Sequence, residues 1–265
     1  MPSSAPKSVS IPTPNPPIPI SPSAASFRSK LPEDIEFDFL DGPFNSDPAA
    51  GIDLFYGPPY YSWWENGSID DIRSAHDWLN EYIAKNGPYD IALMFSQGCV
   101  LGSSILLFHQ EETPHLPPPF RAAIFVCGGP SMNVLEEMGF HVSAEARERD
   151  SASRMALALQ AGSSALLTRG ADRWTGLKSL DSGLSEDKLR DEITSPYRIT
   201  VPTVHIYGSK DPRYAAGVHL SGICDPEKRR TFDHGGGHEI PRTAAVSTSI
   251  AGLFQWAAAQ AGSSQ

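Results

Sequence analysis

The sequence is short of basic residues and has no long apolar run. Its 21 Lys and Arg residues stand against 31 Asp and Glu residues, which gives a formal net charge of -10 at pH 7. Binding to nucleic acid or to anionic membranes draws on clustered Lys and Arg, so this deficit argues against both kinds of partner. Because the sequence also contains neither an apolar run of about 18 residues nor a secretion signal, we expect a soluble, cytoplasmic protein.

Cysteine is also scarce. The three cysteines, Cys99, Cys127 and Cys224, lie in or beside apolar stretches. An odd number of such residues fits packed, reduced thiols better than a disulfide framework. Their spacing matches no metal-binding pattern, so we predict no metal site.

Apolar periodicity indicates the fold. With 265 residues and 40% hydrophobic content, the chain can bury one sizeable core in a single domain. Short apolar or alternating runs that stop at turn residues predict strands at 35–40, 91–95, 122–126 and 204–207. Helical stripes occupy 69–85 and 243–259. Strands that alternate with helices predict an α/β fold, a mostly parallel sheet flanked by helices.

Two segments depart from this alternation. Residues 1–25 are rich in Pro and Ser, and proline removes ladder donors, so we expect this segment to be disordered. The α/β domain is then expected to span residues 26–260. Within it, scattered apolar residues at about 131–200 indicate a helical insertion after a strand's carboxyl end, where pockets form. The insertion is either a lid that shapes an apolar acyl pocket or a peripheral helical layer.

A serine stands at the junction of a predicted strand and an apolar stretch of helical length. The segment reads Leu93-Met94-Phe95-Ser96-Gln97-Gly98. At such a turn the hydroxyl stands above the sheet edge, and the next backbone N–H groups, beginning with Gln97, point at the same spot as an oxyanion hole would. This is a nucleophile elbow, although Met94 replaces the first glycine of the usual G-x-S-x-G pattern. On this pattern alone, Ser96 is either a nucleophile or an ordinary helix N-cap.

Two later segments supply partners for this serine. A nucleophilic serine needs a base to take its proton and a carboxylate to orient that base. Asp211 follows a predicted strand, and His238 follows three glycines before the last helix. The order Ser96, Asp211, His238 is that of α/β-hydrolases. His234 competes as the base, but the glycines favour His238, since they allow its loop to bring the ring over the sheet edge. Asp211 taken alone also fits a turn residue before proline.

Five segments carry a family resemblance. They are FLDGP (39–43), GPPYYSWW (57–64), FSQG (95–98), VHIYG (204–208) with Asp211, and GGHEIP (236–241). In this order they resemble the fungal serine hydrolase family, which includes esterases encoded beside polyketide synthases and a polyketide-releasing thioesterase. The resemblance runs from about Ser26 to Trp256. It implies an α/β-hydrolase-like fold, Ser96 as nucleophile, Asp211 as orienting acid, His238 as base, no cofactor, and an acyl ester or thioester as substrate.

The family pattern is incomplete at the N-terminus. Members open with a strand and a His-Gly loop that lies between the strands corresponding to 35–40 and 91–95 and supplies one oxyanion donor. Such a donor is worth on the order of 100- to 1000-fold in rate. Here the sequence reads Pro-Thr-Pro-Asn-Pro-Pro-Ile-Pro instead. We therefore expect a missing N-terminal strand: either residues 9–20 fill the slot imperfectly or, as we favour, the N-terminus is that of a truncated gene model.

An aromatic cluster lies between the first strand and the first helix. Tyr60, Tyr61, Trp63 and Trp64 either wall an acyl pocket or fill the core, since aromatic side chains bury large areas in both roles. Their place near a strand's carboxyl end favours the pocket rim. We predict Tyr60, Tyr61 and Trp63 as substrate-binding residues.

These observations favour a serine hydrolase that cleaves an ester or thioester of a lipophilic metabolite through an acyl-enzyme intermediate. A polyketide on a synthase carrier protein, in secondary metabolism, is one such substrate, although an acidic surface suits an acidic carrier protein poorly. Two alternatives stay open. One is a general carboxylesterase of small esters, and the other is a catalytically impaired pseudo-hydrolase that lacks its oxyanion strand.

Overall fold

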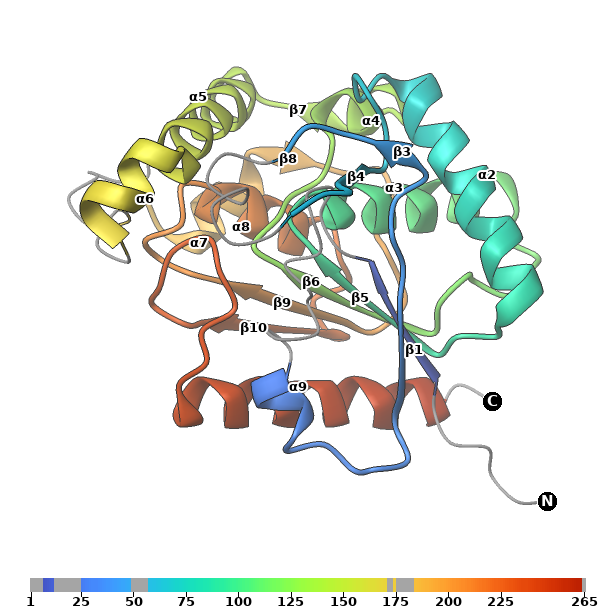
Figure 1. Cartoon of the computed structure of the whole chain (residues 1–265). Coiled ribbons are helices and arrows are strands. Elements are labelled where there is room, and N and C mark those ends of the chain that lie inside the picture. The colour runs from blue at the N-terminus through green and yellow to red at the C-terminus, as the bar shows by residue number, and fades with distance from the viewer. Residues whose placement is uncertain (1–6, 12–24, 49–56, 171–173, 175–183, 264–265) are drawn as a thin grey trace.

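The computed structural model of the protein describes residues 7–11, 25–48, 57–170, 174 and 184–263. Its centre is a six-stranded sheet in the order β10-β9-β6-β5-β1-β2, in which every neighbouring pair is parallel (Figure 1). The strands are β1 (Lys7–Ile11), β2 (Glu36–Phe39), β5 (Ile91–Phe95), β6 (Ala122–Val126), β9 (Thr203–Tyr207) and β10 (Arg229–Asp233). This sheet confirms the predicted α/β fold.

Helices cover both faces of the sheet, with α9 and the short helical segment at 25–28 below it in Figure 1 and the helices α2, α3 and α8 above it. Their bounds are α2 (Ile69–Asn86), α3 (Gln97–Glu112), α8 (Tyr214–Gly222) and α9 (Ala244–Ser263). Successive side chains of a strand point to opposite faces. Accordingly Ile91 and Leu93 of β5 pack in the cluster that contains Phe254 of α9, whereas Ala92 and Met94 pack in the cluster on the other face.

The start of the first long helix, α2, is marked by a capping motif in the sequence. Ser68 accepts a hydrogen bond from the Asp71 N–H at 3.1 Å, and the Asp71 carboxylate accepts one from the Ser68 N–H at 3.1 Å. This reciprocal pair satisfies two backbone donors that the first helical turn leaves free. The predicted helix at 69–85 is therefore confirmed, with one further residue at its end.

Between β6 and β9 the chain forms a mostly helical segment. Its elements are α4 (Met132–Glu137), β7 (His141–Val142), α5 (Ala144–Ala161), α6 (Ser163–Arg169), α7 (Glu186–Asp191) and β8 (Ile193–Thr194). Antiparallel pairing of β7 with β8 brings the two ends of the segment together. A second small ribbon joins β3 (Phe44–Asn45) to β4 (Tyr61–Ser62). No helix in the described ranges is long and apolar enough to cross a membrane.

The strand expected to be missing is present as β1. Val9 lies opposite Asp38 of β2 and opposite Ala92 of β5, both in parallel register. The expectation that residues 1–25 contain no strand is therefore wrong for Lys7–Ile11. The physical reason is local: these five residues, KSVSI, contain no proline and keep all their backbone donors. Residues 12–24, which would carry the loop after this strand, lie outside the described residues.

The position of β1 inside the sheet predicts the effect of proline there. Val9→Pro removes a backbone donor from a strand with neighbours on both sides, so we expect the free energy of unfolding to fall by about 1–3 kcal/mol. For a chain of this length that lowers the melting temperature by about 2–4 °C per kcal/mol. Val9→Ile keeps the N–H and the β-branched side chain and is the control in thermal denaturation. Equal melting of both variants and the unmodified protein would contradict the placement of β1.

Candidate active site

Ser96 occupies a strained turn between β5 and α3. Its backbone has φ 51° and ψ -108°, in a region that residues with a side chain rarely adopt. The Ser96 N–H donates to the Val126 carbonyl oxygen at 2.9 Å, which ties the turn to the end of β6. The Ser96 side chain makes no cap hydrogen bond with α3, so the interpretation as an ordinary helix N-cap fails. The strain instead holds the hydroxyl away from its own helix.

Met94 fits at this elbow because of a glycine in the second turn of α3. Met94 is fully buried, and a Cβ placed on Gly102 of α3 would lie 1.7 Å from the Met94 sulfur. The thioether therefore occupies the space that a side chain at position 102 would need. The large Met94 side chain in β5, which replaces the first glycine of G-x-S-x-G, is thus accommodated by the lack of a side chain at Gly102 in α3.

The three residues predicted to act together lie in one hydrogen-bonded chain. His238 Nε2 is 2.9 Å from Ser96 Oγ, and His238 Nδ1 is 2.9 Å from Asp211 Oδ2. With the proton on Nδ1, the ring donates to Asp211 and accepts the serine proton at Nε2. The other carboxylate oxygen of Asp211 accepts from the Arg213 N–H at 2.8 Å. Asp211 is only 4% exposed, so its negative charge is held away from water beside the imidazole.

The competing histidine has a different environment. His234 Nε2 lies 3.6 Å from the Cys127 sulfur, and His234 Nδ1 accepts from the Gly236 N–H at 3.1 Å. Burial lowers the pKa of His234 below its ordinary value. These contacts make His234 a packing residue of the loop that carries His238.

One group of described residues brings potential metal ligands together. The ligand atoms of Cys127, Asp211 and His238 lie within 4.8 Å of one another. Asp211 and His238 already use these atoms for each other, and burial raises the pKa of the Cys127 thiol well above its ordinary value. A thiol that keeps its proton is a poor metal ligand, so the group suits proton transfer better than coordination. All three cysteines are free and buried, which confirms the prediction of packed thiols.

The backbone beyond Ser96 starts α3. The first N–H groups of a helix have no partner within it, and Gln97 is the first residue of α3. The Gln97 N–H, which directly follows Ser96 in the chain, is therefore one of the donors at the positive end of α3 that have no partner within the helix. The loop expected to supply a second donor falls in residues 12–24, outside the described residues.

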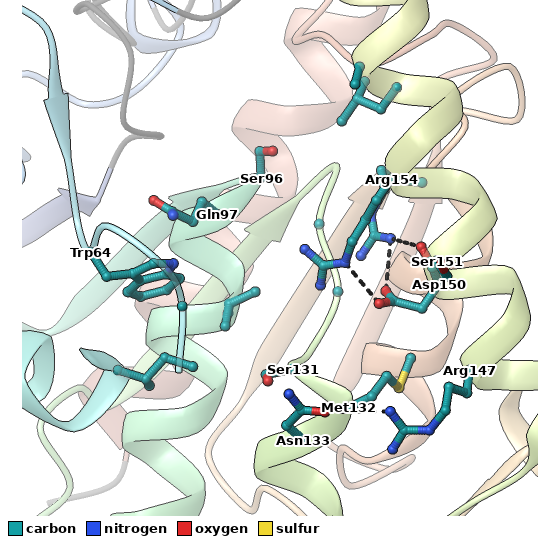
Figure 2. Close-up of a pocket in the computed structure, with 18 of the residues that line it drawn as sticks. Trp64, Ser96, Gln97, Ser131, Met132, Asn133, Arg147, Asp150, Ser151 and Arg154 are labelled. Carbon is teal, nitrogen blue, oxygen red and sulfur yellow. Dashed lines mark hydrogen bonds and ion pairs between the residues drawn. The ribbon is translucent and has the colours of Figure 1, made fainter. Parts of the chain in front are cut away.

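A cavity of about 770 Å³ opens beside Ser96 (Figure 2). It lies between the elbow, the loop that follows β6, and α5, so α5 of the helical segment borders the site. The apolar side chains among its described lining residues are Trp64, Ile72, Val100, Met132, Leu157 and Ala158. Its charged side chains come from α5 and from the turn after β9.

The aromatic residues predicted to bind substrate are placed elsewhere. Trp63 is fully buried and packs edge-on against Trp78, with ring centroids 5.7 Å apart. Tyr60 is 9% exposed, and Tyr61 pairs with Asn45 in the small β3–β4 ribbon. None of the three is among the described residues that line the cavity, whereas the neighbouring Trp64 is. A role of Tyr60, Tyr61 and Trp63 in substrate binding therefore stays a prediction, without support from the described lining of this cavity.

The chain is similar in sequence to known proteins. A family model described as Serine hydrolase (FSH1) matches residues 21–250. Esterase FPY3 of Fusarium mangiferae is 33% identical over 210 residues, 78% of this chain and 74% of the relative. Esterase alnB of Emericella nidulans is 28% identical over 253 residues, 87% of this chain and 88% of the relative.

Solved structures are similar at the level of the fold. An esterase of Pyrobaculum calidifontis aligns with a TM-score of 0.52 and 10% identity, covering 98% of this chain and 77% of that chain. One of two fungal esterases from Rhizomucor miehei aligns with a TM-score of 0.51 and 10% identity, covering 98% of this chain and 74% of its own. These likenesses show an α/β-hydrolase fold, as the motifs imply.

The contact between Met94 and Gly102 predicts non-additive mutations. Gly102→Ala overpacks the elbow and should cost about 1–3 kcal/mol of stability, and Met94→Ala leaves a cavity that should cost about 2–5 kcal/mol. The double variant should cost less than the sum, by about 0.5–3 kcal/mol, since the new methyl group occupies part of the cavity. Chemical denaturation gives the free energy of unfolding of the unmodified protein, the two single variants and the double variant. The control is Gly252→Ala in α9, where a Cβ meets nothing within 4 Å, and this variant should not be destabilised. Strictly additive losses in the double variant would contradict the proposed packing of Met94 against Gly102.

Proposed function

The chain belongs to the serine hydrolase (FSH1) family, and we propose that Ser96, His238 and Asp211 are its nucleophile, base and orienting acid. The family membership confirms the resemblance read from the motifs, and the protein is a hydrolase. The observation that carries the assignment of roles is the chain of two 2.9 Å contacts from Asp211 through His238 to Ser96. Nucleophile, base and orienting carboxylate within hydrogen-bond reach are what acyl transfer by a serine requires.

The proposed reaction runs in two halves. Ser96 Oγ bonds to the acyl carbon as His238 Nε2 takes the hydroxyl proton, and the negative charge moves to the carbonyl oxygen beside the Gln97 N–H. The tetrahedral intermediate collapses with cleavage of the bond to the alcohol or thiol, which takes the proton from His238. Water then attacks the acyl-enzyme with the same base, which releases the carboxylic acid and restores Ser96. Throughout, the Asp211 carboxylate accepts a hydrogen bond from His238 Nδ1–H, and the proton stays on the ring.

The proposed substrate is an ester or thioester of a lipophilic metabolite. The cavity volume of about 770 Å³ lies within the range of small-molecule sites, and one wall is apolar. Relatives named as esterases support hydrolysis of a small-molecule ester. A thioester on a polyketide synthase carrier protein is the finer form of this proposal, and a general carboxylesterase activity is its rival. The pseudo-hydrolase alternative rested on a missing oxyanion strand; β1 lies in the place of that strand, and the loop after it falls outside the described residues.

The two forms of the proposal differ in the leaving group. Matched hexanoyl substrates, one an oxygen ester and one a thioester of N-acetylcysteamine, keep the acyl group constant. A thioester-releasing enzyme should show the larger kcat/KM with the thioester after correction for spontaneous hydrolysis. Preference for the oxygen ester would favour the carboxylesterase.

We further propose a cytoplasmic location. The three free, buried thiols fit a reducing compartment. Fractionation of cells that express the tagged full-length chain, with a cytosolic marker enzyme as control, tests this location; recovery with a secreted marker would contradict it.

The assignment of roles predicts a sharp contrast between the two loop histidines. Ser96→Ala should abolish labelling by a fluorophosphonate probe and lower kcat by at least about 10⁴-fold, and His238→Gln should come close to it, because both remove the same proton transfer. Asp211→Asn should cost somewhat less. His234→Gln changes the neighbouring histidine in the same way and should lower kcat by less than about tenfold.

Two results would overturn this assignment. Labelling that persists in Ser96→Ala would redirect attention to Ser103, Ser131 or Ser209. A loss in His234→Gln equal to that in His238→Gln, with both variants folded by circular dichroism, would exchange the two histidines.

A further inference from the structure

The wall of the cavity that α5 forms carries an excess of positive charge. Asp150 of α5 lies between two guanidinium groups: its Oδ1 is 2.8 Å from Arg213 Nη1, and its Oδ2 accepts from Arg154 Nε at 2.8 Å. Figure 2 shows Arg154 reaching the Asp150 carboxylate at the cavity. One carboxylate neutralises one of the two cations. A formal charge of one remains on this wall.

Arg213 finds its counter-ion and its hydrogen-bond acceptors within the protein. Its side chain is 6% exposed, and Nη1 donates to the Ser153 hydroxyl at 2.7 Å and to the Asp150 carbonyl oxygen at 3.1 Å. Burial alone would raise the pKa of Asp150, but Arg213 and Arg154 together hold it below its ordinary value. Asp150 is therefore ionised and is the counter-ion of the buried Arg213.

Arg154 carries the positive charge on this wall that Asp150 does not neutralise. Its side chain is 53% exposed, and in the part of the chain that the structure describes only its Nε has an acceptor. The two terminal nitrogens of its guanidinium group are directed at the cavity in Figure 2. A planar group with free paired donors matches carboxylate and phosphate oxygens. By contrast Arg147, which also lines the cavity, already pairs with Glu136 and donates to Asn133 at 3.4 Å.

The rest of the cavity offers apolar side chains, so a ligand that fills the cavity also needs an apolar part. The side chains of Trp64, Val100 and Met132 offer an apolar surface near Ser96, and Leu157 lies one turn along α5 from Arg154. A purely apolar acyl chain would fill this volume and leave the Arg154 charge without a counter-ion. A ligand with an apolar part and an anionic end satisfies both surfaces.

We propose that the cavity binds a substrate that carries an anionic oxygen group, and that Arg154 determines this specificity. The inference rests on the proposed function, since Ser96 must be the nucleophile for the cavity to receive the substrate. The anionic group is a carboxylate on the acyl part or a phosphate on the leaving group. Both present the same oxygen acceptors to the guanidinium.

Two pairs of substrates separate these sources. The first pair is the mono-p-nitrophenyl ester of adipic acid and the neutral p-nitrophenyl heptanoate, which differ by a carboxylate on the acyl chain. The second pair is the thioesters of hexanoic acid with 4′-phosphopantetheine and with pantetheine, which differ by one phosphate on the leaving group. The quantity measured is the ratio of kcat/KM for the anionic member to that for the neutral member of each pair.

Arg154→Gln removes the spare charge and leaves the Asp150–Arg213 pair in place, so the fold should be retained. We expect the ratio to fall by about tenfold in at least one pair, with kcat/KM for the neutral member changed by less than about threefold. Arg154→Lys should restore part of the ratio, and the ratio of the unmodified protein should fall as ionic strength rises. A response in the first pair assigns the acyl carboxylate, and a response in the second assigns the leaving-group phosphate.

The control is Arg121→Gln, which removes one positive charge at the opposite edge of the sheet. Arg121 pairs with Asp90 at 3.2 Å beside the amino ends of β5 and β6, so its loss should leave both ratios unchanged. Ratios in Arg154→Gln that match the unmodified protein in both pairs would overturn the inference, provided that Ser96→Ala abolishes turnover of the neutral substrates. Turnover that survives in Ser96→Ala would instead overturn the proposed function.

Discussion

The active-site geometry depends on the position at which β5 stops. β5 is paired on both sides, to β1 and to β6, so its end is fixed in space by two ladders. At that end the backbone of Ser96 turns through a positive φ and α3 begins at once. An unfavourable conformation of this kind persists only where the surroundings determine it fully. Here the two ladders, the Val126 carbonyl and the packing of Met94 against Gly102 provide that constraint.

Parallel pairing then brings the other two groups to the same place. Since the carboxyl ends of parallel strands share one edge, the loops after β5, β9 and β10 meet there, and they carry Ser96, Asp211 and His238. Glycines in the loop before His238 and directly after β9 leave room for the His238 loop to approach the sheet. A Cβ on Gly237 would lie 2.2 Å from the Trp174 ring, and one on Gly208 would lie 2.2 Å from the Gly236 carbonyl oxygen. Side chains at these positions would push the histidine loop off the sheet edge.

The sequence was sufficient for those parts of the structure that local pattern determines. The apolar runs that became β5 and β6 matched to the residue, and the order of Ser96, Asp211 and His238 was enough to identify the residues that meet. β1 was expected to be missing, with residues 9–20 as the other possible occupant of its place, because its five residues lie between prolines. β10 was missed because an edge strand of sequence RRTFD has a polar, largely exposed pattern. Both strands are defined by their partners, and a single-sequence pattern contains no information about partners.

The cavity wall lay beyond sequence reasoning for a related reason. Arg213 and Asp150 are more than sixty positions apart in the chain, and nothing local marks either as buried. Once α5 packs beside the turn after β9, their ion pair links the helical segment to the turn that holds Asp211, because the Arg213 N–H donates to Asp211. Arg213 therefore contacts Asp211 through its backbone and the cavity wall through its side chain. Movement of α5 relative to the sheet would disturb Asp211 and Arg154 together, which couples the orientation of His238 to the position of the Arg154 charge.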